Sequence, residues 1–255
     1  MTKHTQERRN VINNILTKHL LQLLNSPESQ AQCFQEIDNL KLINFSLQLN
    51  TNGWLELYSA DLNQSVSVDF NSNDIQNKIN PQQAKPAILK AIEGRSNHSL
   101  KVLDGTAGLG SDSFVIASRK HTVTSTERSG IIYLLLLDGL RRANLHETIG
   151  KYANNITPLY STTENFLSQT KETFDVIYLD PMFPERKKSA KVKKGMQILQ
   201  LLLGHANCNE SKLFEMAFSR SKKLVIKRAI NNPYFAERKP TNSLKGKTNR
   251  FDIYV

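Results

Sequence analysis

The sequence predicts an α/β protein whose main part is a doubly wound, largely parallel sheet, preceded by a small α/β appendage. Three observations predict this fold. From residue 84 onward, short apolar runs alternate with stretches of helical periodicity, as in parallel strands joined by right-handed crossovers. The run at 100–104 leads into a glycine-rich turn and then an amphipathic stretch, which together form a β-loop-α unit. The last apolar run, at 250–255, predicts a closing antiparallel strand.

The first 75 residues show a different periodicity. Helices are expected over 10–24 and 27–37, and strands over 42–49, 54–58 and 65–70. The pair Asn52-Gly53 separates the first two strands, and Asn-Gly between two such runs is a strong hairpin signal. We therefore expect an appendage over 1–75 with a short antiparallel sheet, and a main domain over 76–255. A polar segment over 71–81 is expected to link them.

Five strands are expected to alternate with helices in the main domain. The strands are expected at 100–104, 121–127, 155–160, 174–180 and 222–228. The helices are expected at 84–93, 111–119, 130–144, 162–169, about 190–203 and 210–220. After Arg228 the sequence shows no further strong helical pattern before the closing strand.

Positive charge is concentrated in the last part of the chain. The formal net charge is +11, and residues 181–255 hold 17 Lys and Arg against 5 Asp and Glu. A basic surface of this kind is typical of proteins that bind a polyanion, because neutralised phosphates release their counterions. The alternative is a solvated basic face with no partner.

The sequence also argues against several classes of protein. The N-terminus is charged and lacks the apolar run of a secretory signal, and the longest apolar stretch, 131–137, is too short to span a bilayer. We therefore expect a cytoplasmic protein without a membrane segment. Cys33, Cys208 and the six histidines have no ligand-like spacing, so no metal site is expected.

The order of the glycines indicates which cofactor binds. A dinucleotide fingerprint requires G-x-G-x-x-G, but here Ser113 occupies the third position after Gly110. Asp104, Gly108 and Gly110 instead fit D-x-x-x-G-x-G, a pattern familiar from enzymes that use S-adenosylmethionine (SAM). SAM is therefore the expected cofactor, and a nicotinamide-dependent oxidoreductase is disfavoured.

Polar residues near the glycine-rich turn are candidates for cofactor binding. Glu127 lies at the end of the second strand, where a carboxylate is suited to accept both hydroxyls of a ribose. Arg128 follows it and is placed to contact the adenosine. Ser111 and Asp112 begin the first helix of this unit, where they are suited both to cap the helix and to contact the cofactor.

The segment Asp180-Pro181-Met182-Phe183 is similar to the D/N-P-P-Y/F/W signature of enzymes that methylate exocyclic amines. Such an amine is a poor nucleophile, so its lone pair must be aimed at the methyl donor. The Asp180 carboxylate and the Pro181 carbonyl oxygen can accept its N–H groups, while Phe183 stacks on the extruded base. A superficially similar segment, Asn231-Asn232-Pro233-Tyr234, follows the fifth strand and lacks the second proline, so we interpret it as a turn.

A run of cations follows this signature directly and is expected to hold the phosphates that flank a target nucleotide. Its members are Arg186, Lys187, Lys188, Lys191, Lys193 and Lys194. A solvated charged face is the alternative.

Taken together, these motifs resemble the ribosomal small subunit methyltransferase J family over residues 65–255. The segments that carry the resemblance are Asp104 to Gly110 with Asp112, Glu127-Arg128, Tyr178 to Pro184, Lys188-Ser189-Ala190, Val192-Lys193-Lys194 and Arg250 to Tyr254. The resemblance implies a Rossmann-like class I methyltransferase that uses SAM to methylate N2 of guanine 1516 in 16S rRNA, with rRNA or the small ribosomal subunit as its partner. It also implies cofactor contacts at Ser111, Asp112, Glu127, Arg128, Thr162, Thr163 and Asp180.

A second hypothesis is a non-catalytic RNA-binding factor in ribosome assembly that retains the methyltransferase fold. The intact Asp180-Pro181-Met182-Phe183 segment disfavours it. The oligomeric state is not predicted by the sequence.

Overall fold

The computed structural model describes residues 24, 27–40, 43–181, 194–203 and 209–255. The expected helix at 10–24 and most of the basic run at 186–194 therefore lie outside the described residues. The chain forms two compact units: Met1–Asp69, Ser129–Arg142 and Phe183–Ala206 make up the first, and Phe70–Arg128, Ala143–Met182 and Asn207–Val255 the second. The expected division at residue 75 stays a prediction.

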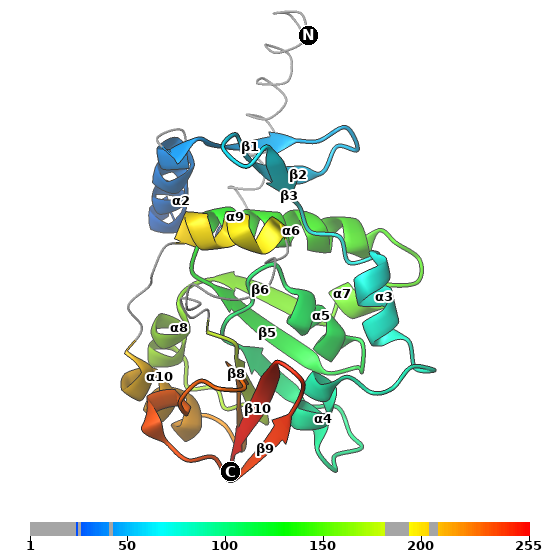
Figure 1. Cartoon of the computed structure of the whole chain (residues 1–255), viewed down its shortest axis with the longest axis vertical. Coiled ribbons are helices and arrows are strands. Elements are labelled where there is room, and N and C mark those ends of the chain that lie inside the picture. The colour runs from blue at the N-terminus through cyan, green and yellow to red at the C-terminus, as the bar shows by residue number, and fades with distance from the viewer. Residues whose placement is uncertain (1–23, 25–26, 41–42, 182–193, 204–208) are drawn as a thin grey trace, which may run out of the picture. The chain divides into compact units, whose positions relative to one another are not determined.

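The second unit contains a seven-stranded sheet with the order β6-β5-β4-β7-β8-β10-β9 (Figure 1). The strands are β4 (Lys101–Asp104), β5 (Thr122–Glu127), β6 (Ile156–Tyr160), β7 (Val176–Leu179), β8 (Leu224–Ala229), β9 (Asn242–Lys245) and β10 (Asn249–Tyr254). The first five of these in the sheet order are parallel, and β10 runs antiparallel to both β8 and β9. The predicted α/β fold with a closing antiparallel strand is confirmed, whereas β9 was not predicted.

The strands at the centre of this sheet follow their apolar sequences. All four residues of β7 are buried, as are the last three of β4, because strands covered on both faces require continuous apolar runs. We call the edge at which the parallel strands end the carboxyl edge. In doubly wound sheets ligands bind beyond this edge.

The helices of the second unit are α3 (Asn73–Ile79), α4 (Ala87–Glu93), α5 (Ser111–Ala117), α7 (Gly150–Ala153), α8 (Thr163–Gln169) and α10 (Glu210–Ser219), together with the 3₁₀ turn η2 (Phe235–Glu237). The expectation of a linker over 71–81 is wrong, because α3 occupies most of it. Ile75 is the only buried residue of α3. The helix has only two apolar residues, Ile75 and Ile79, and two positions are too few to establish a helical periodicity in the sequence.

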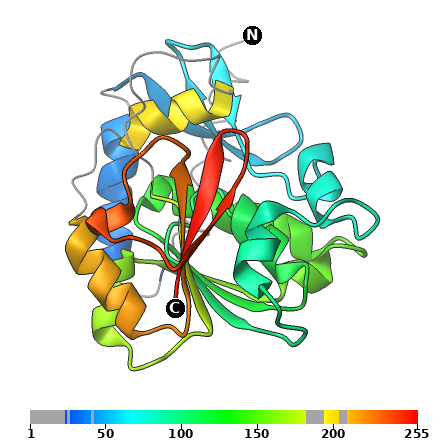
Figure 2. The same ribbon diagram turned by 60° about the horizontal axis from the view of Figure 1, so that its bottom comes forward.

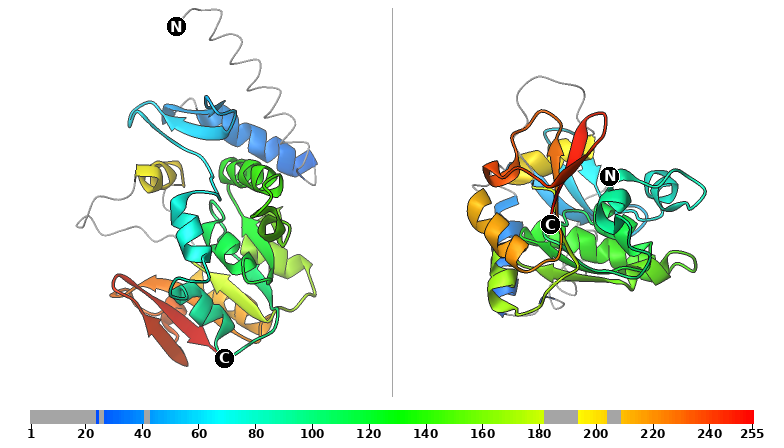
Figure 3. Two further views of the ribbon diagram at one scale, coloured as in Figure 1. Left: turned by 90° about the vertical axis from the view of Figure 1, so that its right-hand side faces the viewer. Right: turned by 90° about the horizontal axis from the view of Figure 1, so that it is seen from below.

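The first unit contains a three-stranded antiparallel sheet, β1 (Phe45–Leu49), β2 (Leu55–Ser59) and β3 (Gln64–Val66). The predicted hairpin is present: β1 pairs with β2, and Gly53 adopts φ +73°, a left-handed conformation that favours glycine. Helix α2 (Pro27–Leu40) packs near β1 (Figure 3). Helix α9 (Lys194–Leu203) also belongs to this unit, and α6 (Gly130–Asn144) begins in it.

A buried carboxylate ties α6 to the β1–β2 hairpin. Asp138 has no exposed surface, accepts a hydrogen bond from the backbone N–H of Leu55 at 3.1 Å, and forms ion pairs with Arg141 and Arg142. The Arg142 guanidinium lies 4.4 Å from the centre of the Trp54 ring. In the described ranges, no helix combines the length and apolar character needed to cross a bilayer.

Candidate active site

The glycine-rich loop leaves β4 at the carboxyl edge, and its glycines meet two different demands. Gly108 and Gly110 have φ values of +53° and +78°, which L side chains rarely adopt. A Cβ on Gly105 would lie 2.6 Å from the side chain of Leu179 and 2.8 Å from the Thr163 hydroxyl. The loop therefore needs glycine at 108 and 110 for its left-handed turns, and at 105 for close contact with the side chains of Leu179 and Thr163.

Asp104 lies below this loop. It has no exposed surface, and its carboxylate accepts hydrogen bonds from the Ser113 hydroxyl at 2.6 Å and from the Thr106 N–H at 3.1 Å. Burial raises the pKa of Asp104 to about 7, and the two hydrogen bonds oppose that shift. These contacts hold the start of the loop in place. The predicted role of Asp104 in cofactor binding would therefore be indirect, through the position of the loop backbone.

Glu127 ends β5 and is joined to the same loop. It is buried, and its Oε2 accepts a hydrogen bond from the Gly108 N–H at 2.9 Å. The backbone continues this connection, because the Ala107 N–H donates to the Thr126 carbonyl oxygen at 3.1 Å. A solvated loop acid would show none of these contacts. Its neighbour Arg128 is exposed.

The residues at the start of α5 differ from one another in role. The helix is capped by Gly110 without a side-chain hydrogen bond, so the expected capping by Ser111 or Asp112 is wrong. Gly110 takes the cap position because the loop needs its left-handed φ there. Ser111 is exposed, whereas Asp112 accepts a hydrogen bond from the Tyr178 hydroxyl at 2.6 Å.

The two threonines after β6 also have structural contacts. Thr162 caps α8 by accepting a hydrogen bond from the Asn165 N–H at 3.1 Å. Thr163 is buried, donates to the carbonyl oxygen of Gly105 and lies 3.2 Å from the Thr126 hydroxyl. Thr163 therefore supports the loop from below, and Thr162 orients the start of α8.

The end of β7 meets the glycine-rich loop directly. The Asp180 N–H donates to the Thr106 hydroxyl at 2.6 Å, and the Gly105 N–H donates to the Tyr178 carbonyl oxygen at 2.9 Å. The Asp180 side chain retains 39% of its exposure, so it remains open to a second molecule. Pro181 follows at intermediate burial, and Phe183 lies outside the described residues.

Lys227 on β8 completes a charged cluster and was not among the residues predicted from the sequence. Its ammonium lies 2.7 Å from Asp180 Oδ2 and 3.2 Å from Asp112 Oδ2. The sequence contained an indication of this role. Lys227 directly follows the apolar residues 224–226 of a predicted strand, and a lysine in a buried strand is rare unless it is paired with an opposite charge. The partners themselves lie 47 and 115 residues away along the chain, beyond the reach of local patterns.

Burial and charge oppose each other in this cluster. Burial raises the pKa of the Asp180 carboxyl, Lys227 lowers it and Asp112 raises it. Burial lowers the pKa of Lys227, but the two carboxylates outweigh burial and leave that pKa above its usual value. Lys227 is therefore a persistent cation between two acids.

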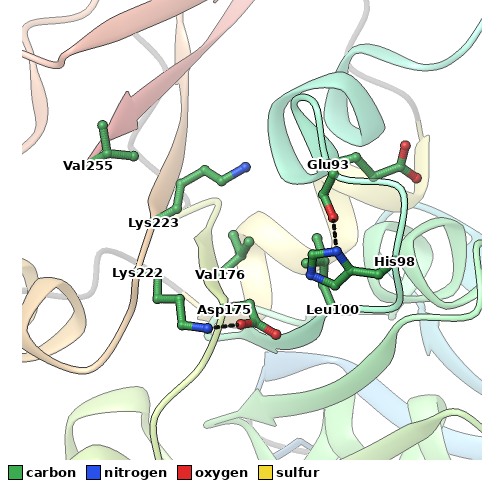
Figure 4. A pocket seen from close by; sticks show the side chains of 9 residues that line it. Glu93, His98, Leu100, Asp175, Val176, Lys222, Lys223 and Val255 are labelled. Carbon is green, nitrogen blue, oxygen red and sulfur yellow. Dashed lines mark hydrogen bonds and ion pairs between the residues drawn. The ribbon is translucent and has the colours of Figure 1, made fainter.

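A pocket lies at the opposite edge of the sheet, where the parallel strands begin (Figure 4). Its lining includes Leu100, Asp175, Val176, Lys222 and Lys223. Lys222 forms an ion pair with Asp175 at 2.8 Å, and Lys223 donates to the Ile92 carbonyl oxygen at 2.6 Å. The predicted site residues at the carboxyl edge take no part in it.

The chain matches known proteins over most of its length. Residues 31–255 match a family described as putative SAM-dependent methyltransferases. A ribosomal RNA small subunit methyltransferase J of Francisella tularensis subsp. novicida is 45% identical over 194 residues, which are 75% of this chain and 80% of that protein. The protein of the same name from Francisella philomiragia is 42% identical over 80% of this chain and 85% of that protein.

A solved structure supports the same relationship. The crystal structure of a SAM-dependent methyltransferase from Neisseria gonorrhoeae is 31% identical, has a TM-score of 0.63 and covers 79% of each chain. The glycine-rich loop, the strand-ending acids and these similarities agree with one another. The chain belongs to the ribosomal RNA small subunit methyltransferase J family of SAM-dependent methyltransferases.

Proposed function

We propose that this enzyme transfers a methyl group from SAM to the exocyclic N2 amine of a guanine in 16S rRNA, at the position 1516 implied by the family resemblance. The observation that supports this most is the hydrogen bond from the Asp180 N–H to Thr106, which holds a substrate-orienting carboxylate against the cofactor loop. The names of the Francisella relatives support rRNA of the small subunit as the substrate. Because that rRNA is cytoplasmic, we propose the same compartment for the enzyme.

The chemistry that this chain must supply is mainly alignment. SAM provides an activated methyl group when bound, so the protein needs to bind, orient and stabilise charge. In our proposal, Asp180 and the Pro181 carbonyl oxygen accept the amine N–H groups, and Phe183 stacks on the base. Lys227 holds Oδ2 of Asp180, and no partner of Oδ1 is recorded among the described residues, which leaves that atom for the substrate.

Transfer to RNA tests this function directly. The purified enzyme is incubated with labelled SAM and either protein-free 16S rRNA or small ribosomal subunits, and the digested RNA is analysed by mass spectrometry. We expect label in N2-methylguanosine and in one oligonucleotide. Methylation of another atom would contradict the proposed reaction, and RNA binding without transfer would favour the non-catalytic assembly factor.

Alanine in place of the lysines in the basic run tests its proposed contact with RNA. The substituted residues are Lys187, Lys188, Lys191, Lys193 and Lys194. We expect weaker RNA binding and a salt dependence whose logarithmic slope falls by up to about 3.5, because each lost contact with single-stranded phosphate removes about 0.7. Filter binding between 50 and 300 mM salt measures the slope. An unchanged slope would assign RNA binding to another surface.

Replacement of Lys227 by methionine tests whether this cation positions Asp180. We expect kcat to fall about 10- to 100-fold, because a hydrogen bond to a charged group contributes about 1.5–3 kcal/mol. Since Lys227 lowers the pKa of Asp180, its removal raises that pKa and moves the acid limb of the kcat–pH profile to higher pH. The profile is measured at saturating SAM and RNA.

Two variants distinguish positioning from a loss of stability. Lys227→Arg retains a cation and should restore the acid limb. Lys223→Met removes a half-buried amine that precedes the same strand at the opposite edge, and it should leave the limb in place. An acid limb that stays in place in Lys227→Met would show that this lysine only supports the fold.

A further inference from the structure

The segment that follows β8 carries an exposed aromatic ring that packs on a buried arginine. Tyr234 is 40% exposed, and the Arg250 guanidinium lies 5.0 Å from the centre of its ring. Arg250 itself is only 5% exposed and forms an ion pair with Asp252. The predicted turn at 231–234 therefore presents a tyrosine whose position is set from beneath.

Two arginines hold the backbone of this segment. Arg250 donates to the carbonyl oxygens of Ala229, Ile230 and Asn232 at 3.2, 2.7 and 2.9 Å. Arg228 donates to the carbonyl oxygen of Pro233 at 3.1 and 3.0 Å. A loop held in this way loses little conformational entropy when it binds a ligand.

A cationic turn lies beside this loop. The β9–β10 hairpin turns at residues 246–248, and the Ile230 N–H donates to the carbonyl oxygen of Thr248 at 3.0 Å (Figure 2). Lys245 at the end of β9 and Lys247 in the turn are exposed, and neither forms an ion pair with another described residue. Their charges are thus available to a polyanion.

The strand register assigns both features to the carboxyl edge. Leu179 of β7 pairs with Ile226 of β8, so Asp180, directly after β7, and Lys227, within β8, lie at the same level of the sheet. The loop that carries Tyr234 begins at Ile230, three residues beyond Lys227. Because β10 is antiparallel and pairs Asn249 with Ala229, the hairpin turn also falls at this edge.

We propose that Tyr234, Lys245 and Lys247 form a contact surface for single-stranded RNA beside the target guanine, which rests on the proposed function. An exposed ring beside unpaired cations suits a base and its neighbouring phosphates, because any base can stack on an aromatic ring and each phosphate attracts a lysine. RNA is favoured over a protein partner because the same edge carries Asp180, the proposed acceptor for the guanine amine.

Three variants test this surface: Tyr234→Ala, Tyr234→Phe and the double substitution Lys245→Ala/Lys247→Ala. The probe is a protein-free transcript of the 3′ part of 16S rRNA, and Kd is measured against salt. We expect Tyr234→Ala to weaken binding about tenfold, because loss of one stacking contact has an effect of this order. Tyr234→Phe should bind as wild type does. The double variant should lower the logarithmic salt slope by about 1.4.

A matched control uses lysines at the opposite edge of the same sheet. Lys120→Ala/Lys222→Ala removes the same charge, and we expect its slope to stay close to that of wild type. SAM affinity and Tm should be unchanged in the Tyr234 variants. The contact surface would be contradicted if Tyr234→Ala bound RNA with wild-type affinity, or if both double variants changed the salt slope equally. If the wild-type enzyme still methylates RNA in that case, the proposed function stands. A wild type that neither binds nor methylates RNA would overturn both.

Discussion

Asp180→Ala is expected to reduce kcat about 100- to 1,000-fold at saturating SAM and RNA. The size of the effect is that of losing a preorganised group which acts on the reacting atoms. The backbone N–H of residue 180 still donates to Thr106 in this variant, so the cofactor loop keeps its support. Single-turnover methylation of 16S rRNA isolates the transfer step from product release.

Asp180→Asn and Asp175→Asn serve as controls for this prediction. Asp180→Asn keeps the shape and one acceptor oxygen but removes the charge that Lys227 pairs with, so we expect an intermediate rate. Asp175 lies just before β7 at the opposite edge, where it accepts a hydrogen bond from the Lys101 N–H at 2.9 Å, and its substitution should leave the rate unchanged. Near-normal turnover in Asp180→Ala would show that another group orients the amine.

Glu127→Ala is expected to weaken SAM binding about 10- to 100-fold with little change in kcat at saturating cofactor. The variant loses the proposed acceptor for the ribose hydroxyls, and hydrogen bonds to a charged group contribute about 1.5–3 kcal/mol. It also loses the acceptor for the Gly108 N–H, which holds the loop to β5. Isothermal titration calorimetry measures the Kd, and the increase in Tm with SAM checks it independently.

Two further variants make the Glu127 result specific. Glu127→Gln retains an oxygen for Gly108 and should bind SAM with intermediate affinity. Glu147→Ala removes an exposed acid from the same unit and should bind SAM as wild type does. An unchanged Kd in Glu127→Ala would mean that the ribose is recognised elsewhere.

Sequence patterns predicted the elements whose formation depends on a few neighbouring residues. The hairpin at Asn52-Gly53 follows from a turn that requires a left-handed residue, and β7 follows from an uninterrupted apolar run. Helix α3 and strand β9 were missed for the complementary reason. Each is short and mostly polar. In β9, buried and exposed residues do not alternate, so the sequence shows no strand periodicity there.

Local sequence patterns were sufficient to predict the α/β fold, the class of cofactor and the strand ends at which the candidate residues occur. These follow from periodicity and from glycine positions, which act over a few neighbouring residues. Which charges meet depends on the folded chain: Asp112, Asp180 and Lys227 come from three separate elements, and Arg250 holds a loop that begins 20 residues before it. Such groups are brought together by the order and register of the strands in the sheet, and no pattern within one segment encodes either of these.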